Sequence, residues 1–315
     1  LNAALIPLAD NTTRAFSDAV EGSGIEAPLF LTQNDGTVMR ADRARAYPVY
    51  SFSSGPTNSM RGAVFLSELD DAMVVDVGGT TTDIGHLKAG FPREANRTVE
   101  VGGVRTLFRM PDLLSLGLGG GSLVDESRRM IGPRSVGHEL ETKATVFGGS
   151  GLTVSDLAVA AGLVSMGDSS RVEHVDPVTL SWFVERSRAM IEEGVDRMKA
   201  TGDPLPLLAV GGGAFLVPDQ LPGISEVIHV KHAPVAYAVG AAIAQVSGEV
   251  DQVFSGISRA EALAEAEALA RSRAVEGGAD LETITAVEIE DLPLAYLPGE
   301  ARRVRVRVVG DALAL

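Results

Sequence analysis

Glycine clustering is the feature of this sequence that most limits how the chain can fold. The 35 glycines include four short blocks, at residues 77–81 (VGGTT), 117–122 (GLGGGS), 147–151 (FGGSG) and 210–215 (VGGGAF). Scattered glycines indicate turns, whereas glycine blocks beside apolar strands indicate that the backbone approaches another group closely. The blocks therefore predict strands that end against a ligand or a neighbouring segment.

The first block lies between two strand-like segments. Residues 72–77 (AMVVDV) read as a buried strand, and residues 81–88 (TTDIGHLK) read as the strand that returns from it. Asp76 lies near the end of the first strand, where burial of a carboxylate is costly unless a metal or hydrogen-bond donors compensate. We therefore expect a cation beside Asp76.

The turn between these strands has the composition of an anion-binding site. Gly78 and Gly79 allow successive N–H groups to point to one place, and the threonines at 80–82 add hydroxyl donors. Phosphate oxygens fit such a turn, and Mg²⁺ commonly combines one or two carboxylates with phosphates and water. Asp83, on the far side, could orient or deprotonate a water molecule. A glycine-rich hairpin with a surface aspartate explains the same residues, so the turn alone leaves both interpretations open.

Strands and helices alternate along the rest of the first 248 residues. Before the hairpin we expect a helix at 5–20, a strand at 27–33 and a helix at 57–69. After it we expect a third strand at 97–103, a short apolar strand running into the second glycine block, a helix at 154–164 with Ser155 as its N-cap, the longest helix at 177–200, strands at 205–210 and 225–230, and a helix at 233–246. This order predicts an α/β domain with a mixed sheet covered by helices on both faces.

The composition changes after residue 248. An alanine-rich charged helix is expected at 259–278, followed by two alternating strands at 282–294 and 301–309. Glutamates alternate on the first strand and arginines on the second, at Glu288, Glu290, Arg303, Arg305 and Arg307. Cross-strand charge pairing explains this pattern better than a basic binding stripe does, because the whole chain is acidic.

Charge and composition exclude several classes of function. The formal net charge of −15 disfavours binding to nucleic acid or to an anionic membrane, and the sequence contains no cysteine. No apolar run approaches the roughly 20 residues that span a bilayer, so we expect a soluble, cytoplasmic protein without membrane contact. The five histidines are too dispersed for a metal set, and the P-loop, nucleophile-elbow and H-E-x-x-H patterns are missing from the sequence.

Three motifs resemble those of the actin, sugar kinase and Hsp70 ATPase superfamily. Residues 76–85 (DVGGTTTDIG) resemble its phosphate-binding hairpin, residues 207–218 (LLAVGGGAFLVP) are similar to its adenosine motif, and residues 233–244 (APVAYAVGAAIA) are similar to its connecting helix. Three motifs in the order typical of this superfamily indicate it much more specifically than any one of them does. The resemblance implies an actin-like ATPase (ribonuclease H-like) fold with a small C-terminal α+β region.

Within that superfamily the sequence resembles the hydantoinase/oxoprolinase family, of the hydantoin utilization protein A type. The resemblance is carried by residues 53–66 (SSGPTNSMRGAVFL), 112–124 (DLLSLGLGGGSLV) and 291–311 (DLPLAYLPGEARRVRVRVVGD). It implies an ATP- and Mg²⁺-dependent hydrolase subunit that opens cyclic amides such as hydantoins or 5-oxoproline, acts with a second subunit and could form a homo-oligomer. A subunit of an ATP-dependent ketone carboxylase, a small-molecule kinase of the sugar or acyl type and a non-catalytic scaffold that kept the fold are the alternatives.

The resemblance assigns roles to individual residues. It implies that Asp76 lies on the Mg²⁺ side, that the backbones of Gly78, Gly79 and Thr80 bind phosphate, that Thr81 and Asp83 lie near the γ-phosphate, and that Gly211, Gly212 and Gly213 lie at adenosine. Asp76 and Asp83 are thus the expected catalytic residues. The block 119–122 either lines the cleft or is a tight packing site between a strand and a turn.

The resemblance also implies a domain organisation. Residues 1–70 resemble a remnant of a first actin-like half, residues 71–248 a second, nucleotide-binding half, and residues 249–315 a C-terminal α+β region. The superfamily holds nucleotide between two halves, each with a glycine hairpin, whereas this sequence has one such hairpin and no initiator methionine. We therefore expect about 150–200 further residues upstream, roughly one more domain, and weak nucleotide binding by this chain alone.

Overall fold

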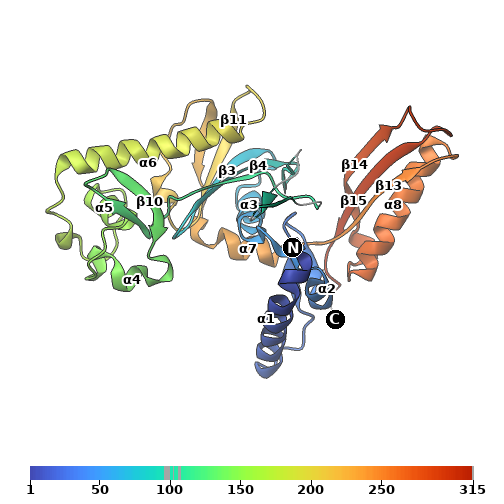
Figure 1. The fold of residues 1–315 in the computed structure, drawn as a ribbon, viewed down its shortest axis with the longest axis horizontal. Coiled ribbons are helices and arrows are strands. Elements are labelled where there is room, and N and C mark those ends of the chain that lie inside the picture. Colours follow the sequence, from blue (N-terminus) through green and yellow to red (C-terminus); the bar gives the residue numbers. More distant parts are fainter. Residues whose placement is uncertain (96–99, 102, 106–107, 314–315) are drawn as a thin grey trace. The chain divides into compact units, whose positions relative to one another are not determined.

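A computed structural model of the chain describes residues 1–313 except 96–99, 102 and 106–107 (Figure 1). The chain divides into two compact units. Unit 1 comprises Leu1–Ser54 with Ile243–Leu315, and unit 2 comprises Gly55–Ala242. Unit 1 therefore joins the first and last parts of the sequence. The interpretation of residues 1–70, 71–248 and 249–315 as two actin-like halves and a C-terminal region stays a prediction.

Unit 2 is built around a mixed sheet in the order β12-β11-β3-β4-β5, with β8 also pairing with β4. Strand β3 is parallel to β11 and antiparallel to β4. The elements are α3 (Ser54–Ser67), β3 (Ala72–Val77), β4 (Thr82–Lys88), β5 (Phe91–Pro92), β6 (Glu100–Val101), β7 (Val104–Arg105), β8 (Leu113–Leu116), β9 (Ser122–Asp125), β10 (Met130–Ser135), α4 (Leu140–Lys143), α5 (Val154–Ala160), α6 (Pro177–Met198), β11 (Leu205–Val210), β12 (Ile224–His229) and α7 (Ala236–Ala242).

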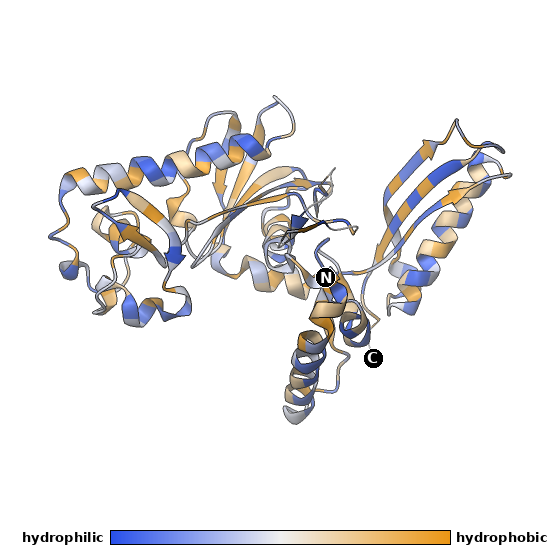
Figure 2. Ribbon diagram, in the orientation of Figure 1, coloured by the Kyte–Doolittle hydropathy of each residue, from blue (hydrophilic) through white to orange (hydrophobic). Residues whose placement is uncertain are grey.

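Both faces of this sheet are buried at its central strands β3 and β11, which explains their nearly continuous apolar sequences (Figure 2). Met73, Val75 and Val77 of β3 join a core that includes residues of α5 and α6. Ala72 and Val74 point to the other face and join a core with residues of α3 and α7. Helices thus cover both faces of a mixed sheet, as the sequence predicted.

Local sequence signals explain where several helices of unit 2 begin. Asp176 caps α6 by accepting hydrogen bonds from the amides of Val178 (2.9 Å) and Thr179 (3.0 Å), and Pro177 occupies the first turn. Helix α5 is capped by Thr153, whose capping box with Asp156 is complete. The predicted N-cap at Ser155 is therefore wrong, because the Thr-x-x-Asp box begins two residues earlier.

Unit 1 contains a second sheet in the order β1-β2-β13-β15-β14, and α8 packs on it. Its elements are α1 (Asn2–Gly22), β1 (Phe30–Thr32), β2 (Val38–Arg40), α2 (Ala41–Ala46), β13 (Val246–Phe254), α8 (Arg259–Glu276), β14 (Thr285–Pro293) and β15 (Arg302–Gly310). Helix α8 buries an alanine at every fourth position, at Ala262, Ala266, Ala270 and Ala274. Gly248 of β13 lies against the backbone of that stripe, so a side chain there would collide with the carbonyl of Ala270.

Two sequence expectations, one for a helix and one for a strand, need correction or restriction. The helix expected at 233–246 ends at Ala242, and Val246 begins β13, a strand that the sequence did not predict. The third strand expected at 97–103 lies partly outside the described residues. The described part of that range contains β6, which pairs over two residues with β7, the strand that follows it. The strands that pair directly with β4, besides β3, are β5 and β8.

Candidate functional site

The first and last glycine blocks lie together at one edge of the sheet of unit 2. Strands β3 and β11 are parallel and Asp76 is in register with Val210, so both strands end at the same edge. The amide of Gly213 donates a hydrogen bond to the carbonyl of Val77 at 2.8 Å. A side chain at Gly211 would collide with the Asp76 carboxylate and the Val77 carbonyl. The residues expected at phosphate and at adenosine are thus neighbours.

Both expected catalytic carboxylates lie in one row across this edge. Asp76 pairs with Asp83 across β3 and β4, and Asp83 pairs with Ser115 across β4 and β8. Side chains in register project from the same face, which here is the face covered by α3. The Ser115 hydroxyl donates a short hydrogen bond to Asp83 Oδ1, and the Thr81 hydroxyl donates to Asp83 Oδ2 at 3.4 Å.

Burial raises the pKa of both carboxyl groups. For Asp76 desolvation is the largest cause, a hydrogen bond from Ser59 of α3 opposes it, and the charge of Asp83 raises the pKa further. For Asp83 desolvation again dominates, while hydrogen bonds from Ser115 and Thr81 lower the pKa. Within the described part of the chain neither carboxylate forms an ion pair. A cation at this edge would offset both the burial and the mutual repulsion.

The turn between β3 and β4 exposes three backbone amides on one side. The carbonyls of Gly78 and Gly79 accept hydrogen bonds from the amides of Gly120 (3.0 Å) and Gly121 (2.6 Å). The carbonyl of Thr80 accepts a hydrogen bond from the Ser122 hydroxyl at 3.2 Å. In a trans peptide the following N–H points away from the carbonyl. The amides of residues 79, 80 and 81 therefore point away from the segment 119–122.

These amides are free of protein acceptors among the residues that the structure describes, and Gly79 and Thr80 are exposed. Adjacent outward N–H groups form an anion-binding concavity. A methyl group added at Gly79 would meet nothing within 4 Å, and neither Gly78 nor Gly79 has a positive φ. The protein's own packing does not require glycine at position 79, which leaves room for an anion to approach the backbone closely.

The second glycine block is a packing site for this turn. Residues 119–122 are buried. A methyl group added at Gly119 would lie 2.6 Å from the backbone N and carbonyl C of Thr80. Of the two roles considered for this block, the geometry shows tight packing against the turn. The sequence analysis named Ser122 only as part of the block 119–122 and did not single out Ser115, although both serines belong to the stretch 112–124 that carried the family resemblance.

The donor set at the edge suits a hard cation shared with a ligand. Asp76 and Asp83 supply carboxylate oxygens, which Mg²⁺ prefers, together with water and phosphate oxygens. Among the described residues, no three or more His, Cys, Asp or Glu side chains lie together in a way that could hold a metal. Mg²⁺ in proteins is commonly held by one or two carboxylates together with water and substrate phosphates.

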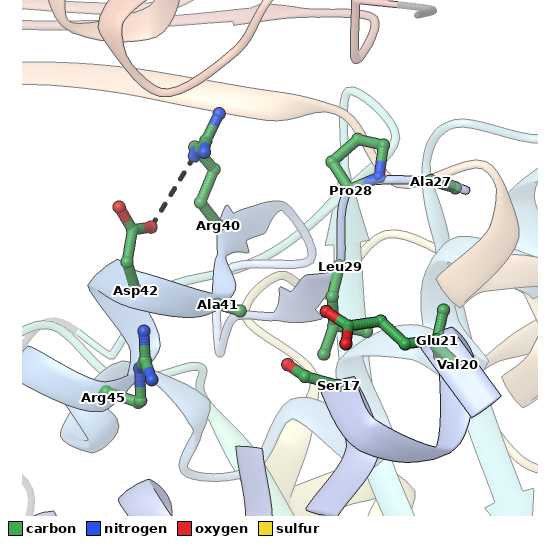
Figure 3. A pocket seen from close by; sticks show the side chains of 10 residues that line it. All are labelled: Ser17, Val20, Glu21, Ala27, Pro28, Leu29, Arg40, Ala41, Asp42 and Arg45. Carbon is green, nitrogen blue, oxygen red and sulfur yellow. Dashed lines mark ion pairs between the residues drawn. The ribbon is translucent and has the colours of Figure 1, made fainter. Parts of the chain in front are cut away.

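A separate pocket of about 240 Å³ lies in unit 1 and contains none of the expected site residues (Figure 3). It is lined by α1, the segment before β1 and α2. Its polar groups include Arg40 and Asp42. Both side chains are exposed, and Arg40 Nε lies 3.6 Å from Asp42 Oδ1. Mixed exposed charges of this kind give no chemical preference for a ligand.

The fold of this α/β protein is similar to the folds of two solved enzymes. The chain superposes on a structure of ATP-dependent caprolactamase from Pseudomonas jessenii with a TM-score of 0.72, 17% sequence identity, and coverage of 98% of this chain and 57% of the other. A nucleotide-free acetone carboxylase structure matches with a TM-score of 0.70, 15% identity, and coverage of 96% and 55%. The expected fold class is thereby confirmed.

The chain belongs to the hydantoinase/oxoprolinase family, whose model matches residues 1–170. Curated relatives include the caprolactamase alpha subunit of Pseudomonas jessenii, 27% identical over 53% of this chain and 25% of the relative. The acetophenone carboxylase gamma subunit of Aromatoleum aromaticum is 29% identical over 49% of this chain and 22% of the relative. The match therefore spans about a quarter of each relative's length. Both relatives are named as enzyme subunits.

None of the helices in the described part of the chain combines the length and the apolarity needed to cross a bilayer.

Proposed function

We propose that this chain supplies the nucleotide-binding site of an ATP-dependent enzyme that opens a cyclic amide of the hydantoin or 5-oxoproline type. The observation that carries the proposal is the edge of unit 2. There, three outward amides lie beside the glycine block 210–215 and beside two half-buried carboxylates that form no ion pair with the described residues. Membership of the hydantoinase/oxoprolinase family and similarity to a caprolactamase subunit support a cyclic amide as the substrate.

Each residue of the edge has a role in this proposal. The amides of Gly79, Thr80 and Thr81 bind phosphate oxygens, and Asp76 holds Mg²⁺. Asp83, held by Ser115, orients the group that attacks phosphorus. The adenosine lies at the glycines 211–213, of which Gly212 is open, since a methyl group added there would meet nothing within 4 Å. When bound, Mg·ATP supplies a phosphoryl group that activates the amide carbonyl and a charge that stabilises the transition state.

A second subunit is part of the proposal because the two named relatives are subunits of larger enzymes. An ATP-dependent ketone carboxylase is the alternative reaction. It is favoured by the similarity to an acetophenone carboxylase subunit and by the acetone carboxylase fold. The two reactions share the nucleotide site and differ in the acceptor, since only the carboxylase requires bicarbonate.

The test is an ATPase assay of the whole protein with and without its neighbouring subunit. Hydantoins, 5-oxoproline and caprolactam form one panel, and simple ketones with bicarbonate form the other. We expect ATP turnover that depends on a cyclic amide, and its loss by at least about a hundredfold in Asp76→Ala. The matched control is Asp196→Ala, which removes an exposed aspartate on α6.

ATP turnover that requires bicarbonate and a ketone would contradict the proposed amide hydrolysis and support the carboxylase reaction. Asp76→Ala with full turnover would remove the proposed metal role. An assembled complex without any ATP turnover would leave the scaffold interpretation in place.

A further inference from the structure

We infer that the buried segment Gly119–Ser122 sets the direction of the phosphate-binding amides, and that Ser122 is a positioning residue for the terminal phosphates of a nucleotide. This inference rests on the proposed function, because it concerns the same site. It goes beyond the two roles that the sequence left open for this block, lining of the cleft or tight packing, by giving the packing a consequence for binding.

The first argument is the hydrogen-bond pattern between the two segments. Three consecutive carbonyls of the turn, those of Gly78, Gly79 and Thr80, bond to three consecutive residues of the block, Gly120, Gly121 and Ser122. Each of these bonds fixes the rotation of one peptide plane, and each plane carries one of the outward amides. The block thus controls all three amides without touching the ligand.

Ser122 is the member of the block whose side chain carries out this task. It is 0% exposed, and its hydroxyl accepts a hydrogen bond from the Gly119 amide at 2.9 Å while it donates to the Thr80 carbonyl at 3.2 Å. The Ser122 hydroxyl oxygen also lies 3.4 Å from the Gly117 carbonyl oxygen, a second and longer acceptor for the same hydrogen. Without the hydroxyl, the plane between Thr80 and Thr81 loses its fixed partner, and the Thr81 amide becomes free to turn.

Gly119 holds the same turn by contact. A methyl group there would lie 2.6 Å from the Thr80 backbone and 2.8 Å from the carbonyl carbon of Gly79. Backbone atoms cannot yield as the end of a side chain can, so any residue other than glycine would displace the turn. The two residues therefore hold the turn in one position, Ser122 by a hydrogen bond and Gly119 by close packing.

The functional consequence is selectivity for the number of phosphates. In the proposed site adenosine lies at residues 211–213, whereas only the terminal phosphates reach the turn. A misdirected Thr81 amide should weaken binding of ADP and ATP and leave AMP almost unaffected. A residue with only a structural role would weaken all three equally or change only stability.

The experiment measures dissociation constants of AMP, ADP and ATP by calorimetry on the whole protein. We expect Ser122→Ala to weaken ADP and ATP binding about tenfold and AMP binding less than about twofold, the scale of one lost hydrogen bond. Ser187→Ala is the matched control, since Ser187 is also buried and donates to the Phe183 carbonyl at 2.8 Å within α6. Gly119→Ala should lose more ADP affinity than Ser122→Ala does, and Gly202→Ala, where a methyl group meets nothing within 4 Å, is its control.

The outcomes separate this inference from the proposed function. An unchanged ratio of AMP to ADP affinity in folded Ser122→Ala overturns the inference and leaves the proposed function standing. A changed ratio in a protein that shows no turnover supports the inference and overturns the proposed reaction. No selectivity for ADP over AMP in the unsubstituted protein overturns both. Thermal unfolding of each variant shows whether it is folded under the conditions of the titration.

Discussion

The two sheets of this protein differ in whether their charged side chains have ion-pair partners. In unit 1, arginines project from β15 and each lies beside a carboxylate of a neighbouring strand. In unit 2, Asp76 and Asp83 lie side by side at the sheet edge, and burial raises the pKa of both. One sheet pairs its charges across strands, whereas the other has two half-buried carboxylates that form no ion pair with the described residues.

The charge network of unit 1 is continuous across its strands. Arg305 forms an ion pair with Glu249 of β13 at 2.6 Å and another with Glu288 of β14 at 2.8 Å. Glu288 also lies 3.3 Å from Arg307, which lies 3.6 Å from Asp35. Figure 2 shows the alternation of polar and apolar residues along β14 and β15 that places these charges on one face. The valines between them, such as Val304 and Val306, face the α8 side.

Under the proposed function, the charges of unit 1 serve stability and the carboxylates of unit 2 serve binding. A buried ion pair is costly to break, because removing one partner leaves the other charge uncompensated. A buried carboxylate without a partner destabilises the fold until a ligand supplies the missing charge. Substitutions should therefore have opposite effects on stability in the two sheets.

The largest expected effect is at Arg305, whose side chain is 1% exposed. Arg305→Ala leaves Glu249 and Glu288 without their shared cation, so we expect the free energy of unfolding to fall by about 3–5 kcal/mol. Urea denaturation measures this loss. Arg303→Ala is the matched control, because Arg303 also pairs with a carboxylate, that of Asp251, but its side chain is 50% exposed. That control should cost less than about 1 kcal/mol. Equal losses in the two variants would show that the buried network has no special weight.

The next effect has the opposite sign. Asp76→Asn removes a half-buried charge that repels Asp83, so in the absence of Mg²⁺ and nucleotide we expect the protein to gain about 1–2 kcal/mol of stability at neutral pH. The same variant should lose ATP turnover. Denaturation in a chelator and the ATPase assay measure the two properties separately. A destabilised Asp76→Asn would mean that the carboxylate is already compensated within the protein.

The pH dependence of stability follows from the same carboxyl groups. Because the pKa of Asp76 and Asp83 is raised in the folded protein, the folded state binds their protons more tightly than the unfolded state does. The two carboxylates therefore destabilise the fold fully at pH values above their raised pKa in the folded protein. This effect disappears as the pH falls toward the ordinary aspartate pKa of 3.8. The advantage of Asp76→Asn over the parent protein should shrink across that window. Urea midpoints of both proteins at several pH values test this, and an advantage that grows with acid would contradict it.

Local sequence patterns were sufficient to predict the elements that carry the expected site. Strand β3 (Ala72–Val77) and strand β11 (Leu205–Val210) match the predicted ranges, because continuous apolar runs followed by glycines mark buried strands clearly. The partners of the site residues were not predictable in this way. Ser115 reaches Asp83 because β8 pairs with β4, a pairing between segments about thirty residues apart that no local pattern encodes.

The charge network shows the same limit. The sequence predicted that arginines of β15 pair with glutamates of β14, and this is confirmed for Arg305 and Arg307 with Glu288. It missed Glu249 and Asp251, because β13 follows a helix of small residues without a clear break and was not recognised as a strand. An unrecognised strand hides every partner that lies on it.

The smallest expected effect compares two serines that bond to aspartates in unit 2. Ser115 donates to the half-buried Asp83, whereas Ser170 donates at 2.6 Å to Asp168, which lies in an exposed turn. A hydrogen bond to a partly desolvated carboxylate contributes more to stability than one in water does. Ser115→Ala should therefore lower the free energy of unfolding at neutral pH, by up to about 1 kcal/mol. Ser170→Ala should leave the urea midpoint unchanged. If the two serines behaved alike, Asp83 would be as well solvated as a surface aspartate, and the contrast between the two sheets would rest on Asp76 alone.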